Sequence, residues 1–127
     1  MKQKFMICNH CGNIIGIVEQ PGAPLVCCGE EMQEMIPNSS GASVEKHMPV
    51  FEVKDNLVTV TVGEAIHPME AGHHIAWISL QTKQGNQRKK LAVDGEPKAI
   101  FAICEGDEVE AVYEYCNLHG LWKAENK

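Results

Sequence analysis

The sequence predicts a mainly β protein in which a small, metal-stapled N-terminal domain precedes an antiparallel β-sandwich or barrel. Four of the six cysteines fall within the first 36 residues, a segment too short to bury a hydrophobic core of its own. The remainder contains short stretches in which apolar and polar residues alternate, as they do in half-buried strands. No stretch keeps a 3.6-residue apolar period, so we expect no long amphipathic helix.

A polar segment separates the two parts. Residues 37–43 have the sequence Pro-Asn-Ser-Ser-Gly-Ala-Ser, and small turn-forming residues of this kind are typical of a linker. We therefore expect one domain over residues 1–36 and a second over residues 37–127.

Five stretches of the second part have the composition of strands. Residues 58–62 place three valines on one face and two threonines on the other. Similar β-prone stretches follow at residues 75–80, 90–93, 99–103 and 109–115, separated by Gly, Pro, Asn or Asp. Short strands at this spacing predict an antiparallel sandwich or barrel.

The charge balance argues against a nucleic-acid partner. The formal net charge of the 127 residues is −6, and the brief basic run Arg88-Lys89-Lys90 is expected to be a solvated strand end. No secretory signal is visible at the start, and no stretch approaches the roughly 20 apolar residues of a membrane helix. We therefore expect a cytoplasmic protein, where abundant cysteines indicate metal ligation and not disulfides.

The first candidate metal site is formed by cysteines alone. Cys8 and Cys11 make a Cys-x2-Cys knuckle, and Cys27 and Cys28 supply a second pair, which completes the four sulfur ligands of a tetrahedral zinc or iron ion. Adjacent cysteines must be bent back towards one ion, because neighbouring side chains of an extended chain point to opposite sides. The spacing is equally compatible with zinc and with iron, and His10 is expected to be solvated.

The second candidate site combines histidines with a cysteine. His47, His67, His73 and His119 lie in expected loops or strand edges, and Cys116 precedes His119 by three residues. A β-sandwich gathers its loops at its ends, where ligands distant in sequence can meet. Imidazole and thiolate together suit a transition metal, and five protein ligands would leave a sixth octahedral position open for chemistry.

Two further residues of ligand type are expected to be bystanders. His74 follows His73 directly, so in a strand it faces the other way. Cys104 ends an apolar stretch and is expected to be a small buried hydrophobe.

These motifs, taken together, resemble a known family. The chain is similar over essentially its whole length to desulfoferrodoxin, the two-iron class of superoxide reductase. The resemblance rests on motifs in the family's order: Cys8-x2-Cys11 with Cys27-Cys28, Glu45-Lys46-His47, His67-Pro68-Met69, Gly72-His73, and Glu114-Tyr115-Cys116-Asn117-Leu118-His119-Gly120.

The resemblance implies the following architecture and cofactors. Residues 1–36 would form a desulforedoxin-like domain with a rubredoxin-type iron, and the rest an immunoglobulin-like β-sandwich that carries a catalytic iron. Each chain would hold two iron ions, and two chains would form a homodimer. The catalytic iron would have His47, His67, His73 and His119 as equatorial ligands and Cys116 as its axial ligand.

The resemblance also assigns a reaction. The enzyme would reduce superoxide by one electron to hydrogen peroxide, with electrons from a rubredoxin-like donor. The axial thiolate would push electron density towards the open position. Lys46 would steer the superoxide anion to the site, and Glu45 would close the sixth position after peroxide leaves.

Two other readings of the same residues remain open. The chain could be a non-enzymatic carrier that uses both irons in electron transport without oxygen chemistry. Alternatively, the cysteine segment could be a zinc staple, and the sandwich a ligand-binding module. The open coordination position and Lys46 favour the enzyme.

Overall fold

The computed structural model describes residues 2–39, 41 and 44–126. The chain divides into two compact units, Met1–Ile36 and Pro37–Lys127. The mainly β fold class predicted from the sequence is confirmed, since the one helix assigned in the described residues is a single turn. No helix of this part of the chain is long and apolar enough to cross a membrane.

The first unit consists of very short strands held by a small core. A three-stranded sheet has the order β2-β1-β5, and β3 pairs with β4 in a separate hairpin. Among the described residues of this unit, the buried apolar side chains are Phe5, Met6, Cys8 and Met32. So little buried apolar surface needs a cross-link of some kind to hold the fold. The strands are β1 Phe5–Ile7, β2 Ile14–Gly16, β3 Val26–Cys27, β4 Glu30–Glu31 and β5 Gln33–Glu34.

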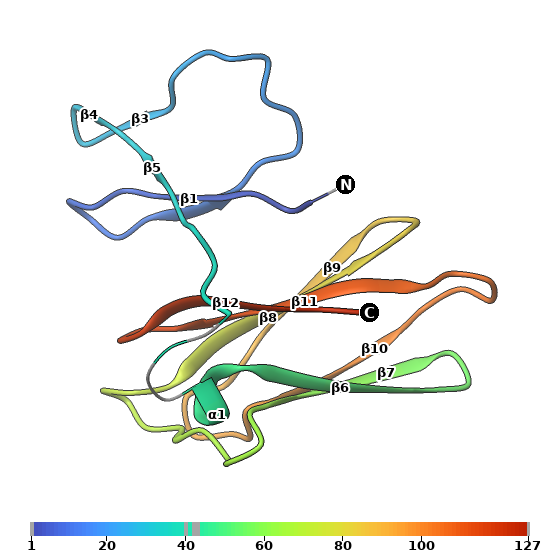
Figure 1. The fold of residues 1–127 in the computed structure, drawn as a ribbon. Coiled ribbons are helices and arrows are strands. Elements are labelled where there is room, and N and C mark those ends of the chain that lie inside the picture. The colour runs from blue at the N-terminus through green and yellow to red at the C-terminus, as the bar shows by residue number, and fades with distance from the viewer. Residues whose placement is uncertain (1, 40, 42–43, 127) are drawn as a thin grey trace. The chain divides into compact units, whose positions relative to one another are not determined.

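The second unit is an antiparallel β-sandwich. Its sheets have the orders β10-β7-β6 and β12-β11-β8-β9, and both can be followed in Figure 1. The elements are α1 Val44–His47, β6 Pro49–Lys54, β7 Leu57–Val62, β8 Ile75–Thr82, β9 Asn86–Lys90, β10 Lys98–Ala102, β11 Val109–Cys116 and β12 Gly120–Glu125.

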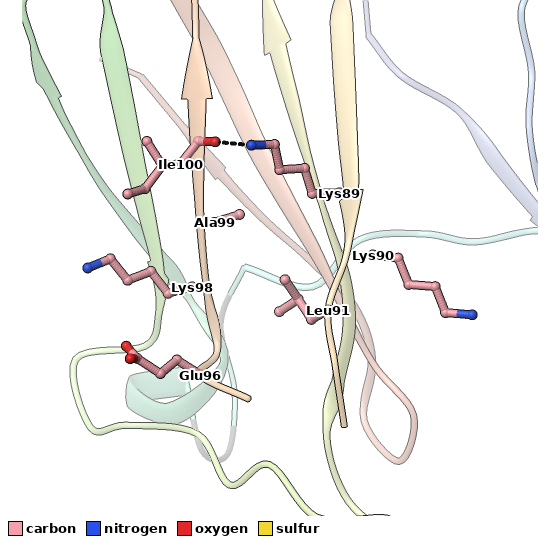
Figure 2. A pocket seen from close by; sticks show the side chains of 7 residues that line it. All are labelled: Lys89, Lys90, Leu91, Glu96, Lys98, Ala99 and Ile100. Atoms are coloured by element: carbon pink, nitrogen blue, oxygen red, sulfur yellow. Dashed lines mark hydrogen bonds between the residues drawn. The ribbon is translucent and has the colours of Figure 1, made fainter. Parts of the chain in front are cut away.

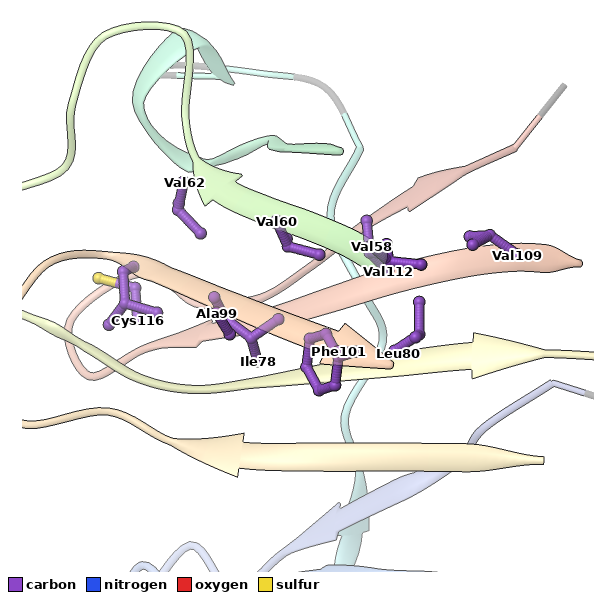
Figure 3. Close-up of a cluster of buried hydrophobic side chains, with 11 residues drawn as sticks. Val58, Val60, Val62, Ile78, Leu80, Ala99, Phe101, Val109, Val112 and Cys116 are labelled. Carbon is purple, nitrogen blue, oxygen red and sulfur yellow. The ribbon is translucent and has the colours of Figure 1, made fainter. Parts of the chain in front are cut away.

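The core between the sheets ends at a cysteine. The three inward valines of β7 are fully buried, lie beside apolar side chains of the neighbouring β10 and face those of β8 and β11 (Figure 3). Burial of each such side chain contributes about 1.5–3 kcal/mol. Cys116 closes this cluster at the end of β11, with no exposed surface. Its side chain is therefore held by the packed core.

The structure corrects three details of the sequence prediction. The strand expected at residues 90–93 lies earlier, at β9, because Asn86–Lys90 is a fully exposed edge strand without apolar alternation. Strands β6 and β12 were not anticipated. Cys104, expected to be buried, is exposed, because β10 ends at Ala102 and the following residues leave the sheet.

Two candidate metal sites

Two tight turns present the four cysteines of the first unit. In the first turn, the Gly12 N–H donates to the Cys8 carbonyl at 2.8 Å, and Gly12 takes a φ of 84°. In the second, Cys28 itself takes a φ of 54°, in the left-handed region that non-glycine residues rarely adopt. This turn brings two adjacent cysteines to the same side of the chain, as the sequence required.

The sulfur distances fit a tetrahedral ion. All four cysteines are free, and their sulfurs lie within 4.8 Å of one another. The Cys11 and Cys27 sulfurs are 3.6 Å apart, and those of Cys27 and Cys28 are 4.0 Å apart. Four bonds of about 2.3 Å to one ion place tetrahedral sulfurs roughly 3.8 Å apart. A disulfide needs about 2.05 Å, so the arrangement is that of a metal site.

The close contacts among these thiols shift their pKa values. The backbone N–H of Cys11 lowers the pKa of Cys8 to about 6. Hydrogen bonding with Cys11 raises the pKa of Cys27, and it raises that of Cys28 to about 12. Close sulfurs oppose one another's ionisation, so an ion must supply the positive charge that holds all four as thiolates.

The ligand-type residues of the second unit come from three segments. His47 is the last residue of α1, His67 and His73 lie in the loop between β7 and β8, and Cys116 ends β11. These four residues bring their ligand atoms within 4.8 Å of one another. His119 lies in the turn between β11 and β12, where its Nδ1 is 3.6 Å from the Cys116 sulfur.

The four imidazole rings form a square. Ring centroids around its sides are separated by 4.7 Å for His47 and His67, 4.6 Å for His67 and His73, 5.1 Å for His73 and His119, and 4.7 Å for His119 and His47. The diagonal from His47 to His73 is 6.4 Å. Neighbouring rings meet edge to face, at 66–79°. Cys116 is the buried fifth member of the group.

The nitrogen atoms are oriented for a shared ion. The Nε2 atoms of His47 and His67 are 3.2 Å apart, close to the roughly 3.0 Å between adjacent nitrogens that lie about 2.1 Å from one ion in a square. Nδ1 of His67 donates to the Pro68 carbonyl at 2.7 Å, so the lone pair is on Nε2. Nε2 of His73 is buried and has no hydrogen-bond partner, a state that a metal bond would relieve.

Burial sets the protonation of this group. It lowers the pKa of His67 to about 4, and it lowers the pKa of His73 as well. Both rings are therefore held neutral, which is the form that binds metals. Burial raises the pKa of Cys116, so a metal that binds there displaces the thiol proton.

Two residues that sequence reasoning gave no role hold the site together. Trp122 stacks on the His47 ring at 4.9 Å, and its indole N–H donates to the His119 carbonyl at 3.2 Å. Asn117 joins the two ligand loops, because its Oδ1 accepts from the His74 N–H at 2.8 Å and its Nδ2 donates to the Gly72 carbonyl at 3.1 Å. Their only sequence signal was their place within or just beyond the Cys116–His119 motif.

Glu45 and Lys46 lie on α1, exposed and directly before His47. Burial is the main cause of the lowered pKa of His73, and the charge of Lys46 adds a minor contribution. The backbone of both residues packs on Gly63, where an added Cβ would lie 2.7 Å from the Glu45 carbonyl oxygen. The Glu45 carbonyl also accepts from the Ala65 N–H at 3.0 Å. Gly63 thus permits the close approach that sets the helix beside the site.

Two histidines stay outside both clusters. His10 is exposed within the first cysteine turn. The Nδ1 of His74 donates to the Glu70 carbonyl at 2.9 Å, and this residue is not in the group of converging ligand atoms.

Comparisons with known proteins match both units. The family model described as desulfoferrodoxin matches residues 39–125, and the one described as desulfoferrodoxin, N-terminal domain, matches residues 2–35. A desulfoferrodoxin of Nitratidesulfovibrio vulgaris is 48% identical over 118 residues, which cover 93% of this chain and 92% of that protein. The solved superoxide reductase of Treponema pallidum has a TM-score of 0.84 and 36% identity, covering 98% of each chain.

A further solved structure matches a smaller share of the chain. The superoxide reductase of Giardia intestinalis, described as 1Fe-SOR, covers 65% of this chain and 98% of its own, with a TM-score of 0.51 and 33% identity.

Proposed function

This chain belongs to the desulfoferrodoxin family, and on this premise we propose that it is a superoxide reductase. The reaction consumes one superoxide, one electron and two protons and yields one hydrogen peroxide. Two iron ions per chain would be the cofactors, one at the four-cysteine site and one at the histidine and cysteine site.

The square of imidazoles above a buried thiol is the observation that carries this proposal. Four imidazole nitrogens and one sulfur would supply five ligands to an ion that takes six, which would leave one position for the substrate. Cys116 has no exposed surface and lies on the core side, whereas His119 is exposed. Superoxide would therefore approach the histidines from the solvent side, away from the buried Cys116. Iron, when bound, supplies the single electron that superoxide accepts.

We assign distinct roles to the two charged residues of α1. Superoxide is an anion that approaches a chain with a net charge of −6, so local positive charge at the site raises the encounter rate. Lys46 is exposed and acts electrostatically on His73, which supports a steering role. The Glu45 carboxylate, one residue away, would replace the departing peroxide at the open position.

The four-cysteine site is proposed to relay electrons. A thiolate-bound iron exchanges one electron without changing its ligands, and a rubredoxin-like protein would be the external donor, which reduces the second site either directly or through the first. The Giardia match covers 65% of the chain and carries a one-iron description, which supports placing the reaction in the second unit. We therefore expect Cys28→Ser to abolish iron binding at the first site while superoxide reduction continues. Loss of superoxide reduction together with iron binding at the first site would contradict the assignment of the reaction to the second unit.

We also propose an assembly and a location for the protein. We expect a homodimer located in the cytoplasm. Light scattering on the purified iron-loaded protein would give a mass near twice 14.0 kDa; a mass of one chain would contradict the dimer.

A superoxide pulse tests the function directly. The reduced protein is mixed with superoxide, and its decay and the peroxide yield are followed. One peroxide per superoxide with no oxygen released identifies a reductase, whereas one peroxide per two superoxides identifies a dismutase. If the protein does not accelerate superoxide decay, it is either the non-enzymatic electron carrier or the zinc-stapled binding module. A colourless protein that contains only zinc would identify the binding module.

A further inference from the structure

A shallow cavity opens between the edge strands of the two sheets. It lies between β9 and β10, has a volume of about 460 Å³, and Figure 2 shows the side chains around it. Leu91 and Ala99 supply its apolar part, and Leu91 packs against the hydrophobic core. Lys90 and Lys98 point away to either side. The result is an apolar centre flanked by cations.

The cavity is closed to strand addition. The free edge of β10 would be open to a pairing strand, but the side chain of Lys89 donates to the Ile100 carbonyl. Two residues away along each strand, Gln87 Nε2 donates to the Ala102 carbonyl at 2.8 Å. These contacts occupy the edge carbonyls, so a partner must bind through side chains.

The charge of this surface is opposite to that of the whole chain. The cavity lining contains three lysines and one glutamate, and Arg88 lies beside them on β9. Within the described part of the chain, neither Lys90 nor Lys98 has an ion-pair partner. Unpaired cations around an apolar centre attract an acidic surface without burying a charge pair.

A short covalent and hydrogen-bonded route leads from this surface to the histidine and cysteine site. The Leu91 N–H donates to the Ala76 carbonyl at 2.9 Å. The next residue back, Ile75, is paired with Cys116 across β8 and β11. Leu91, Ile75 and Cys116 also belong to one packed apolar cluster. The route from Leu91 to the Cys116 sulfur therefore crosses a single intervening strand, β8, with one interstrand step on each side of it.

We propose that this surface, defined by Lys90, Leu91, Lys98 and Ala99, docks a small acidic protein that donates one electron. This inference rests on the proposed function, which consumes one electron per superoxide. The donor is oxidised by one electron, the oxidised site at Cys116 is reduced by one, and no covalent bond changes. A contact of this kind is small and transient, because electron-transfer encounters need fast release.

Charge reversal tests the docking surface. The variants are Lys90→Glu, Lys98→Glu and the double variant, and the matched control is Lys54→Glu at the β6–β7 turn. Each single variant changes the charge equally, and Lys54 is also exposed. Stopped-flow mixing of the oxidised, iron-loaded protein with a reduced acidic rubredoxin gives the rate constant of electron transfer. A second assay measures the reaction of each pre-reduced protein with superoxide.

The expected outcome separates docking from catalysis. Near 0.01 M ionic strength, where charges act over about 30 Å, we expect each single variant to slow electron transfer about threefold and the double variant about tenfold. The difference should vanish near 1 M, where the screening length is about 3 Å. The superoxide reaction should change less than about twofold.

Three results would overturn the docking surface. Lys54→Glu could slow electron transfer as much as the double variant, the double variant could match the unmodified protein, or the superoxide reaction could fall in parallel, which would make these lysines a steering patch for the substrate. If the unmodified pre-reduced protein does not react with superoxide, the proposed function fails instead.

Discussion

Replacing Asn117 by alanine should loosen the histidine and cysteine site without touching a ligand. The Asn117 side chain ties the loop that carries His73 to the turn that carries Cys116, through hydrogen bonds to the His74 N–H at 2.8 Å and the Gly72 carbonyl at 3.1 Å. Asn117→Ala removes both bonds. The backbone N–H of Asn117, which donates to the His74 carbonyl at 3.2 Å, is retained.

The size of the effect follows from those two bonds. A hydrogen bond contributes about 0.5–1.5 kcal/mol net, so two contribute about 1–3 kcal/mol. Asn117 is exposed, and water replaces part of what is lost, which favours the lower half of that range. About 1–2 kcal/mol corresponds to a 5–30-fold change in an equilibrium or rate. We expect the ion at this site to be released faster by that factor.

Chelator competition on the iron-loaded full chain measures this release. Loss of absorbance from the Cys116–iron bond reports the second site, and loss of the four-sulfur absorbance reports the first site in the same sample. His74→Ala is the matched control, because it removes a ring and its hydrogen bond to the Glu70 carbonyl within the same loop, while the backbone N–H of residue 74 still donates to Asn117. The proposed role of the Asn117 side chain would be refuted if Asn117→Ala released iron at a rate within twofold of the unmodified protein. It would also be refuted if His74→Ala accelerated the release equally.

Three more changes are informative. Lys46→Ala should slow the superoxide reaction several-fold and flatten its salt dependence; pulse experiments that give an unchanged rate would remove Lys46 from steering. Gly63→Ala should destabilise the second unit by about 1–3 kcal/mol in urea unfolding, because a Cβ there meets backbone atoms, whereas Gly72→Ala, with open space around it, should not. Burial raises the pKa of Glu114 to about 9; since this lies above the ordinary value, the folded metal-free protein loses stability as pH rises from about 4.5 to about 9. Glu114→Gln should remove that loss, about 3 kcal/mol at pH 7, and an unchanged pH profile would contradict it.

The first metal site could be predicted from the sequence because its geometry is local. Each cysteine pair lies within one turn, and the turn residues Gly12 and Cys28 adopt the left-handed backbone that aims the sulfurs. Strand β7 could also be predicted, because its valines alternate with threonines and therefore lie on one face. Both features depend on residues only a few positions apart, so short-range patterns in the sequence are enough to predict them.

Residues that act across the fold left little trace in the sequence. Asn117 reaches Gly72 across 45 positions, and no spacing rule connects the two. Trp122 looks like an ordinary strand residue until β12 pairs with β11 and sets its ring on His47. The polar edge strand β9 gave no apolar alternation to detect, because its side chains are exposed on both faces.

Strand direction explains which cysteine at a strand end joins the site. Antiparallel strands alternate between the two ends of the sandwich. His47 precedes β6, β6 runs away from it and β7 returns, so the β7–β8 loop with His67 lies at the same end. Strand β10 then runs away and β11 returns, which sends Cys104 to the opposite end and Cys116 to the histidines.

The same alternation places the proposed docking surface. Strand β8 runs away from the histidine end and β9 returns to it, so residues 91–97 join the ligand loops there, while the β6–β7 turn with Lys54 lies at the other end. Because β6 was not predicted from the sequence, the reversals of strand direction could not be followed, although all the proposed ligands had been identified. With β6 and β9 located, the order of strands alone separates the loops that can reach the iron from those that cannot. The unpaired lysines beside Leu91 are then near the site by topology, which is why their charge, and not that of Lys54, is expected to govern electron entry.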